Sequence, residues 1–185
     1  MKHLLTLALL WVPTLESQAA VYTNVLSDKS TIRFISKQMN VPVEGDFKKF
    51  AARVVFDTAK PESGRAEIEL EPGSIDTGFS EGNETVQDKD WFNVKTFPKS
   101  RFVASSVKSL GKGQYQAMGK LTLKDKTRDV VVPFTVKPQG DTLVLDGTFE
   151  LKRLDYGIGS GLWGDTAVVA NEVQIKFHFT LGTQK

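Results

Sequence analysis

The chain has 185 residues, of which 40% are hydrophobic and 25% are charged, a balance typical of a folded globular domain. The 24 Lys and Arg residues against 22 Asp and Glu leave a formal net charge of +2, too small to attract nucleic acid over a distance. Cysteine is absent, which excludes disulfides, thiolate metal sites and cysteine nucleophiles. We therefore expect one ordinary domain with no nucleic-acid partner.

The first 19 residues have the pattern of a secretory signal peptide. Lys2 supplies the positive charge, residues 4–12 are apolar, and Ser17–Ala19 is a small-x-small cleavage site. The apolar run is much shorter than the roughly 20 residues that a membrane-spanning helix needs. We therefore expect cleavage after residue 19, a folded domain over residues 20–185 and export to the periplasm or the extracellular medium, without a membrane-spanning segment.

Alternation of apolar and polar side chains recurs along the rest of the chain and predicts a mostly β structure. In the last segment, for example, Phe177 and Phe179 alternate with Lys176 and His178. The segment Ser80–Trp91 lacks this alternation, which favours a short helix or an ordered loop. The alternating segments are residues 32–37, 50–57, 66–71, 115–124, 130–137, 143–152 and 173–181.

Short turns rich in glycine and proline separate these segments, so we expect neighbouring strands to pair as antiparallel hairpins. About eight strands with one apolar face each must hide those faces. They can do so by packing as two sheets or by closing into one barrel, and the pattern alone allows both.

The inward face of these strands carries many aromatic rings as well as small residues. A barrel of about eight strands is just wide enough to hold one slender ligand where some inward positions are small. An apolar chain inside would gain about 0.8 kcal/mol per buried methylene. The alternative is a filled hydrophobic core in a structural or stress-related interaction protein. The candidate ligand-lining residues are Phe34, Ala52, Phe56, Ile68, Ala117, Phe134, Phe149 and Phe177.

The sequence offers little that could perform catalysis. After the predicted leader, His178 is the only histidine, and it falls on the outward face of its strand, where a solvated or surface-paired ring is expected. The glycine-rich segment Gly157–Gly161 precedes strand-like residues and not a helix, so it predicts a turn and not a phosphate site. We expect no enzymatic activity and no metal site.

Arg153, Asp155 and Trp163 lie close together beside glycines at the end of a predicted strand. They are candidates for lining the mouth of a barrel, where they would meet a polar headgroup. The alternative is a structural corner in which Arg153 bonds to backbone carbonyls and Trp163 closes the barrel end.

Several motifs resemble the signatures of the YceI-like family of lipocalin-like proteins. Ser74–Gly78 is similar to the family's S-I-D-T motif, and Asp90–Phe102 to its D-F-F-D-x-x-x-[FY]-P-x-x-x-F motif. Gly119–Val130 and Gly45–Phe50 are similar to a hairpin and a turn of the family. Arg153–Trp163 resembles the R-x-D-[FY]-G-[IV]-G-x-G-x-W variant of one subgroup.

The resemblance implies an all-β fold, an eight-stranded antiparallel lipocalin-like barrel with a short helix. It also implies export to the periplasm, no established catalytic activity, and binding of a polyisoprenoid or prenyl quinone without a covalent cofactor. The subgroup motif implies a partnership with a membrane b-type cytochrome, by association alone.

Overall fold

The computed structural model describes residues 20–183, so the predicted signal peptide lies outside the described residues. Five of the seven segments predicted to be strands lie wholly within a strand, and the other two, 66–71 and 115–124, extend one residue beyond theirs. The segment Ser80–Trp91 begins with the one short α-helix that the described residues form. The strands are β1 (Val21–Val25), β2 (Thr31–Gln38), β3 (Val41–Phe47), β4 (Phe50–Asp57), β5 (Arg65–Leu70), β6 (Ile75–Asp76), β7 (Ser100–Gly111), β8 (Gln114–Leu123), β9 (Lys126–Gln139), β10 (Thr142–Lys152) and β11 (Glu172–Thr183). The helical segments are α1 (Ser80–Thr85) and the 3₁₀ turns η1 (Ser27–Lys29), η2 (Pro61–Ser63), η3 (Pro72–Ser74), η4 (Arg153–Tyr156) and η5 (Gly161–Trp163).

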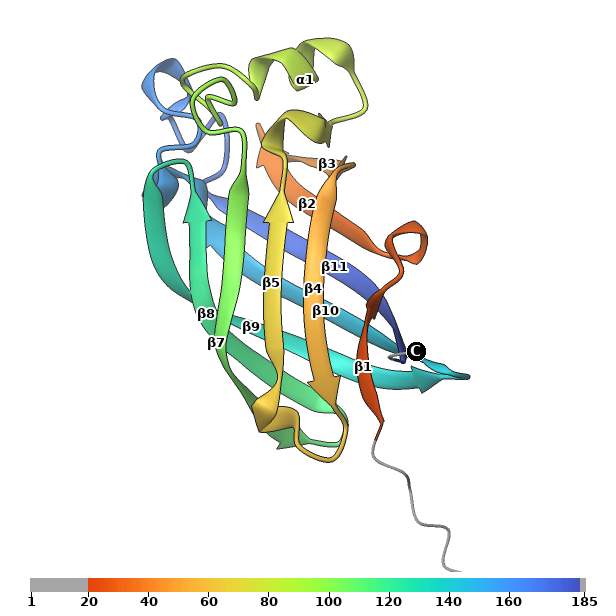
Figure 1. The fold of residues 1–185 in the computed structure, drawn as a ribbon. Coiled ribbons are helices and arrows are strands. Elements are labelled where there is room, and N and C mark those ends of the chain that lie inside the picture. Colours follow the sequence, from red (N-terminus) through yellow and green to blue (C-terminus); the bar gives the residue numbers. More distant parts are fainter. Residues whose placement is uncertain (1–19, 184–185) are drawn as a thin grey trace, which may run out of the picture.

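Eight of the strands close into an antiparallel barrel (Figure 1). Their order around the barrel is β1, β4, β5, β7, β8, β9, β10 and β11, and β11 returns to β1. The short strand β1 closes the ring, because Tyr22 pairs with Phe56 on β4 and Val25 pairs with Leu181 on β11. The predicted eight-stranded lipocalin-like barrel is therefore confirmed over the two-sheet alternative.

The three remaining strands extend the wall toward α1. The first half of β11 pairs with β2, β2 pairs with β3, and β3 pairs with β6. Since β6 ends only a few residues before α1, this branch leads the chain directly to the helix at one end of the barrel (Figure 1).

Strands β9 and β10 are paired along only part of their length, and their pairing ends at Phe134 and Gly147. The preceding β9 residue is Pro133, which has no N–H group to continue the ladder. Beyond this point a second hydrophobic cluster joins the two strands. Its buried members Tyr156 and Ile158, from η4 and the turn after it, pack among apolar side chains of β8, β9 and β10.

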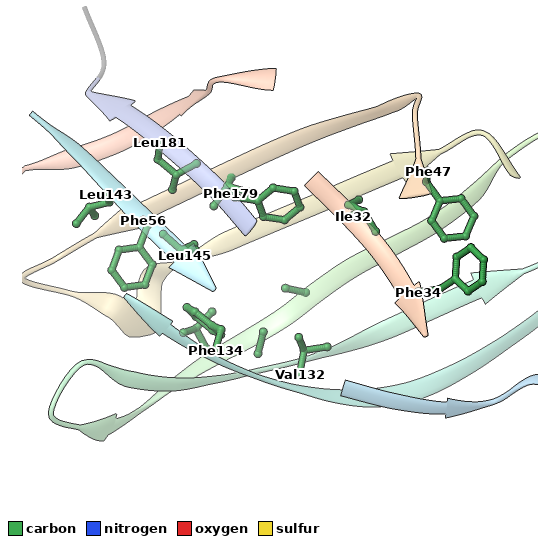
Figure 2. Packing of buried hydrophobic residues seen from close by; sticks show 14 of the residues in the cluster. Ile32, Phe34, Phe47, Phe56, Val132, Phe134, Leu143, Leu145, Phe179 and Leu181 are labelled. Atoms are coloured by element: carbon green, nitrogen blue, oxygen red, sulfur yellow. The ribbon is translucent and has the colours of Figure 1, made fainter. Parts of the chain in front are cut away.

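The barrel end far from α1 is densely packed. The rings of Phe56 and Tyr115 meet edge to face with centroids 5.2 Å apart, and Phe134 lies 6.3 Å from Phe56. Figure 2 shows the buried side chains of β10 and β11 gathered near Phe56, with Phe34 and Phe47 together at the other side of the view. Those of β10 and β11 are Leu143, Leu145, Phe179 and Leu181.

We expect Leu181→Ala to destabilise the protein by about 2–5 kcal/mol, because it leaves a cavity among neighbours that cannot collapse into it. Leu181 is fully buried, whereas Leu110 is 49% exposed. The matched control Leu110→Ala should change stability by no more than about 0.5 kcal/mol. Urea unfolding followed by circular dichroism measures both, and similar losses would contradict the packed far end.

Candidate functional site

A cavity of about 360 Å³ occupies the inside of the barrel. Phe79, Gly82 and Val86, from α1 and its flanks, line it at one end, and Phe56 and Phe134 line it toward the packed far end. Nearly all of the lining is apolar. This volume falls within the range of about 300–1,000 Å³ in which proteins hold small molecules.

Most of the predicted lining residues do face this cavity. Ala52 is not among the residues that line it, and its role in ligand binding stays a prediction. It lies on the inward face of β4 opposite Ile68, but its short side chain packs against the larger members of the core, which form the cavity surface in its place. The predicted residues that line the cavity are Phe34, Phe56, Ile68, Ala117, Phe134, Phe149 and Phe177.

Glycines on neighbouring strands make room for several of these rings. Gly147 pairs with Phe177 across β10 and β11, and a Cβ atom added to Gly147 would collide with the Phe177 ring. Gly45 stands in the same relation to Phe34. Gly119 pairs with Ala104, and a Cβ atom added to it would collide with the nearby Phe102 ring. Each ring thus lies against the backbone of the adjacent strand. A side chain at the glycine would force the ring toward the middle of the barrel.

Arg153 organises the loop at the α1 end of the barrel. Its side chain is 1% exposed, and its Nε, Nη1 and Nη2 groups all donate to backbone carbonyls. Burial lowers the pKa of the guanidinium, which nevertheless stays charged, as arginine does in proteins. The acceptors are the carbonyl oxygens of Ala170 at 3.0 Å, Ile158 at 2.9 Å, Trp163 at 2.7 Å, Val169 at 2.7 Å and Gly159.

These bonds support the structural-corner interpretation of Arg153. All the donor nitrogens of its guanidinium are engaged by the protein, so Arg153 borders the cavity without a donor to offer a headgroup. Gly159 is required beside it, because its φ is +68° and an added Cβ would strike the guanidinium.

Asp155 is not at the mouth of the cavity, and that prediction is wrong. Within the 3₁₀ turn η4, Arg153 and Tyr156 point inward while Asp155 is exposed, with Arg128 at 4.0 Å. Trp163, by contrast, does line the cavity, as predicted. His178 lies on the outer face as expected, and its Nδ1 is 2.7 Å from a carboxylate oxygen of Asp146.

Sequence reasoning missed Trp91, which also lines the cavity. Its ring centroid lies 5.6 Å from that of Trp163, and the Arg153 guanidinium is 5.7 Å from the Trp91 ring. The indole Nε1 of Trp91 is buried and has no hydrogen-bond partner among the described residues. Such a donor is rare in native proteins and points to a function.

Phe79 and Phe92 were missed as well, although both line the cavity. They and Trp91 belong to the irregular segment that crosses the barrel end around α1, where no periodicity marks a side chain as inward. The Asp90–Phe102 motif was the one available signal, because it places two aromatic residues next to each other at Trp91 and Phe92.

A family model described as the YceI-like domain matches residues 24–181. The chain belongs to the YceI-like family. Among residues 20–183 of this YceI-like protein, no group of three or more His, Cys, Asp or Glu side chains is placed to hold a metal ion. No helix in that range is long and apolar enough to cross a membrane.

Solved structures share this fold. The crystal structure of BcnA from Burkholderia cenocepacia is 46% identical with a TM-score of 0.83, covering 85% of this chain and 99% of that one. A polyisoprenoid binding domain from Saccharophagus degradans, implicated in plant cell wall breakdown, has a TM-score of 0.66 at 14% identity, over 90% of this chain and 100% of that domain.

Relatives are also found among curated sequences. A UPF0312 protein of Pseudomonas syringae is 31% identical over 122 residues, which are 63% of this chain and 64% of that protein. The match thus spans less than two thirds of that relative's length. A UPF0312 protein of Shewanella denitrificans is 29% identical over 95% of this chain and 97% of its own.

We expect Arg153→Met to destabilise the protein by about 3 kcal/mol or more, because buried carbonyls lose their charged donor. The neighbouring Arg128 also bonds a carbonyl, that of Asp155, but its side chain is half exposed. Water can replace it there, so the control Arg128→Met should cost about 1 kcal/mol or less. Thermal unfolding measures both, and equal losses would contradict a special role for the buried arginine.

Proposed function

We propose that this YceI-like protein is a carrier that binds a slender apolar lipid, of the polyisoprenoid or prenyl quinone type, inside its barrel. The observation that carries the proposal is the cavity of about 360 Å³ with its almost wholly apolar lining. Burial of a hydrocarbon chain there gains about 0.8 kcal/mol per methylene before ordering costs. The polyisoprenoid binding domain from Saccharophagus degradans, which shares the fold, supports this class of ligand.

The cavity argues against the alternative of a filled, purely structural barrel. Tight packing around Leu143 and Leu181, which are almost completely buried, occupies only part of the interior. Rings such as Phe34 and Phe177 lie over glycines of neighbouring strands, which leaves space beside them.

The place of action in this proposal is the periplasm, after removal of residues 1–19. The support is the charge, the apolar run and the small-residue site in that segment. The resemblance of Arg153–Trp163 to the subgroup motif predicts a membrane b-type cytochrome as partner, and this stays a prediction. In the structure this segment builds the loop around Arg153 at the barrel end.

The ligand in this proposal has one polar end, which accepts a hydrogen bond from Trp91. The Nε1 group of Trp91 is the buried donor without a partner at the cavity, whereas Arg153 beside it is fully bonded. Because Trp91 lines the cavity, a hydroxyl or carbonyl oxygen of the ligand is the partner that we propose for this donor. Leaving such a donor unpaired costs about 1–3 kcal/mol, which a bound oxygen would recover in part.

Filling the cavity should abolish binding. We expect Ala117→Trp to prevent capture of geranylgeraniol, because Ala117 lines the cavity and is 7% exposed. Ala51→Trp, on the outward face of β4, is the matched control and should bind like the unchanged protein. Native mass spectrometry after incubation with the alcohol counts the bound fraction.

A second filling variant, Ala66→Phe, covers the case in which Ala117→Trp does not fold, since Ala66 lines the same cavity. Circular dichroism shows whether each variant is folded. Undiminished binding by a folded filling variant, or no binding by the unchanged protein, would overturn the proposed function.

Trp91→Phe should weaken binding of geranylgeraniol by about fivefold to tenfold, corresponding to one lost hydrogen bond. The same variant should bind the matching hydrocarbon, which lacks the hydroxyl, as well as the unchanged protein does. Trp163→Phe keeps the Trp91 donor and is the control, for which both ligands should respond alike. Titration calorimetry gives the affinities, and an equal effect of Trp91→Phe on both ligands would rule out the hydrogen bond.

A further inference from the structure

The barrel end that carries α1 exposes a group of large apolar side chains. Leu162 is 96% exposed, Met39 68%, Val41 62%, Phe79 51% and Val168 37%. Together we call these five side chains the apolar rim.

The members of the apolar rim come from three loops that meet around the end of the cavity. The β2–β3 turn touches the loop before β11, because the Met39 N–H donates to the Val168 carbonyl at 2.7 Å. Phe79 itself lines the cavity, and Leu162 directly precedes the cavity-lining Trp163. The rim therefore continues the apolar lining of the cavity out to the protein surface.

The opposite end of the barrel has a different character. Its turns are residues 58–64 between β4 and β5, 111–113 between β7 and β8, and 140–141 between β9 and β10, and they are polar or glycine-rich. Outside the rim, the described residues expose five large apolar side chains on separate strands: Val131 at 51%, Leu110 at 49%, Met118 at 40%, and Val21 and Val55 at 39%. The three most exposed large apolar side chains, Leu162, Met39 and Val41, all lie at the cavity end.

The rim loops also carry very little charge. Residues 38–43 and 77–80 contain no charged side chain, and residues 157–170 contain one, Asp165. The first of these loops is a two-residue turn in which Met39 and Asn40 have φ values of +48° and +64°. A positive φ is uncommon for methionine, and turns of this type usually carry glycine, asparagine or aspartate, so an exposed Met39 here is unusual.

We propose that the apolar rim docks the mouth of the barrel on the surface of a lipid bilayer. Three separate loops that project uncharged side chains fit a fluid apolar phase, which needs no matching shape, better than they fit a rigid protein partner. Trp163 beside Leu162 adds the type of side chain that is enriched at membrane interfaces. The reason for docking rests on the proposed function, since a bound lipid could then enter the cavity without crossing water.

The proposal predicts binding to neutral lipid that salt does not weaken. Residues 20–185 are used, because residues 20–183 contain the whole barrel and the apolar run 4–12 would bind lipid by itself. The probe is a phosphatidylcholine vesicle with brominated acyl chains. We expect the protein to float with the vesicles equally from about 0.05 to 0.5 M NaCl, and the bromine atoms to quench tryptophan fluorescence.

The double variant Leu162→Ser, Met39→Ser should lower vesicle binding at least tenfold, and the matched control Val131→Ser should leave it unchanged. Undiminished vesicle binding by the double variant would overturn the proposal. Absence of vesicle binding by the unchanged protein would also overturn the proposal, even if its rim bound a protein from a lysate.

Binding of geranylgeraniol in vesicle-free solution separates this proposal from the proposed function, because the double variant should retain it. Loss of vesicle binding with capture of the alcohol intact supports docking by the rim. If the unchanged protein captures the alcohol but does not bind vesicles, docking is wrong and the carrier function stands. If it binds vesicles through the rim but never captures the alcohol, docking stands and the carrier function is wrong.

Discussion

The structure depends on one constraint, that every strand has an apolar face which must leave water. Closing the sheet on itself satisfies this constraint for all eight strands at once, and the pairing of β1 with both β4 and β11 makes the closure. Closure removes the edges that β1 and β11 would otherwise expose, while the branch through β2 and β3 ends at the edge strand β6. The same closure encloses a space, whose fate then depends on the side chains that point into it.

That space is filled in one part and hollow in another, and the difference has a local cause. Phe56, Tyr115 and Phe134 contact one another near the far end, while Gly64, just before β5, and Val107 on β7 still line the cavity there. Toward α1, Phe34 and Phe177 pack over glycines and stay close to the wall. The placement of glycine therefore leaves space in the barrel beside these rings.

Much of the fold was predictable because a strand with one solvent-exposed face has alternating polar and apolar residues, which can be recognised directly in the sequence. The strand β7 escaped prediction for a physical reason. Its register shifts between Ala104 and Ser106 and again between Ser109 and Gly111, so the alternation breaks within the strand. The same alternation indicates which side chains point inward, but it does not show which neighbours cover a small side chain such as Ala52.

The mouth of the cavity was harder to predict than its wall. Arg153 and Asp155 are two residues apart, yet Arg153 is buried against backbone carbonyls and Asp155 is exposed, because the 3₁₀ turn that contains both directs them to different sides. Trp91 belongs to the irregular crossing around α1, and only the tertiary path brings it to Trp163. The contacts of side chains in irregular segments depend on the whole fold, and the local sequence pattern does not predict them.

The pairing of β1 with β11 also determines when the barrel closes during folding. The two strands lie at opposite ends of the described chain, and Val25 meets Leu181 only after everything between them has been made. Contacts between residues so distant in sequence carry a large loop-closure cost and form slowly. A nascent chain therefore has no enclosed interior until its last strand is in place, and folding must finish before the protein can hold anything.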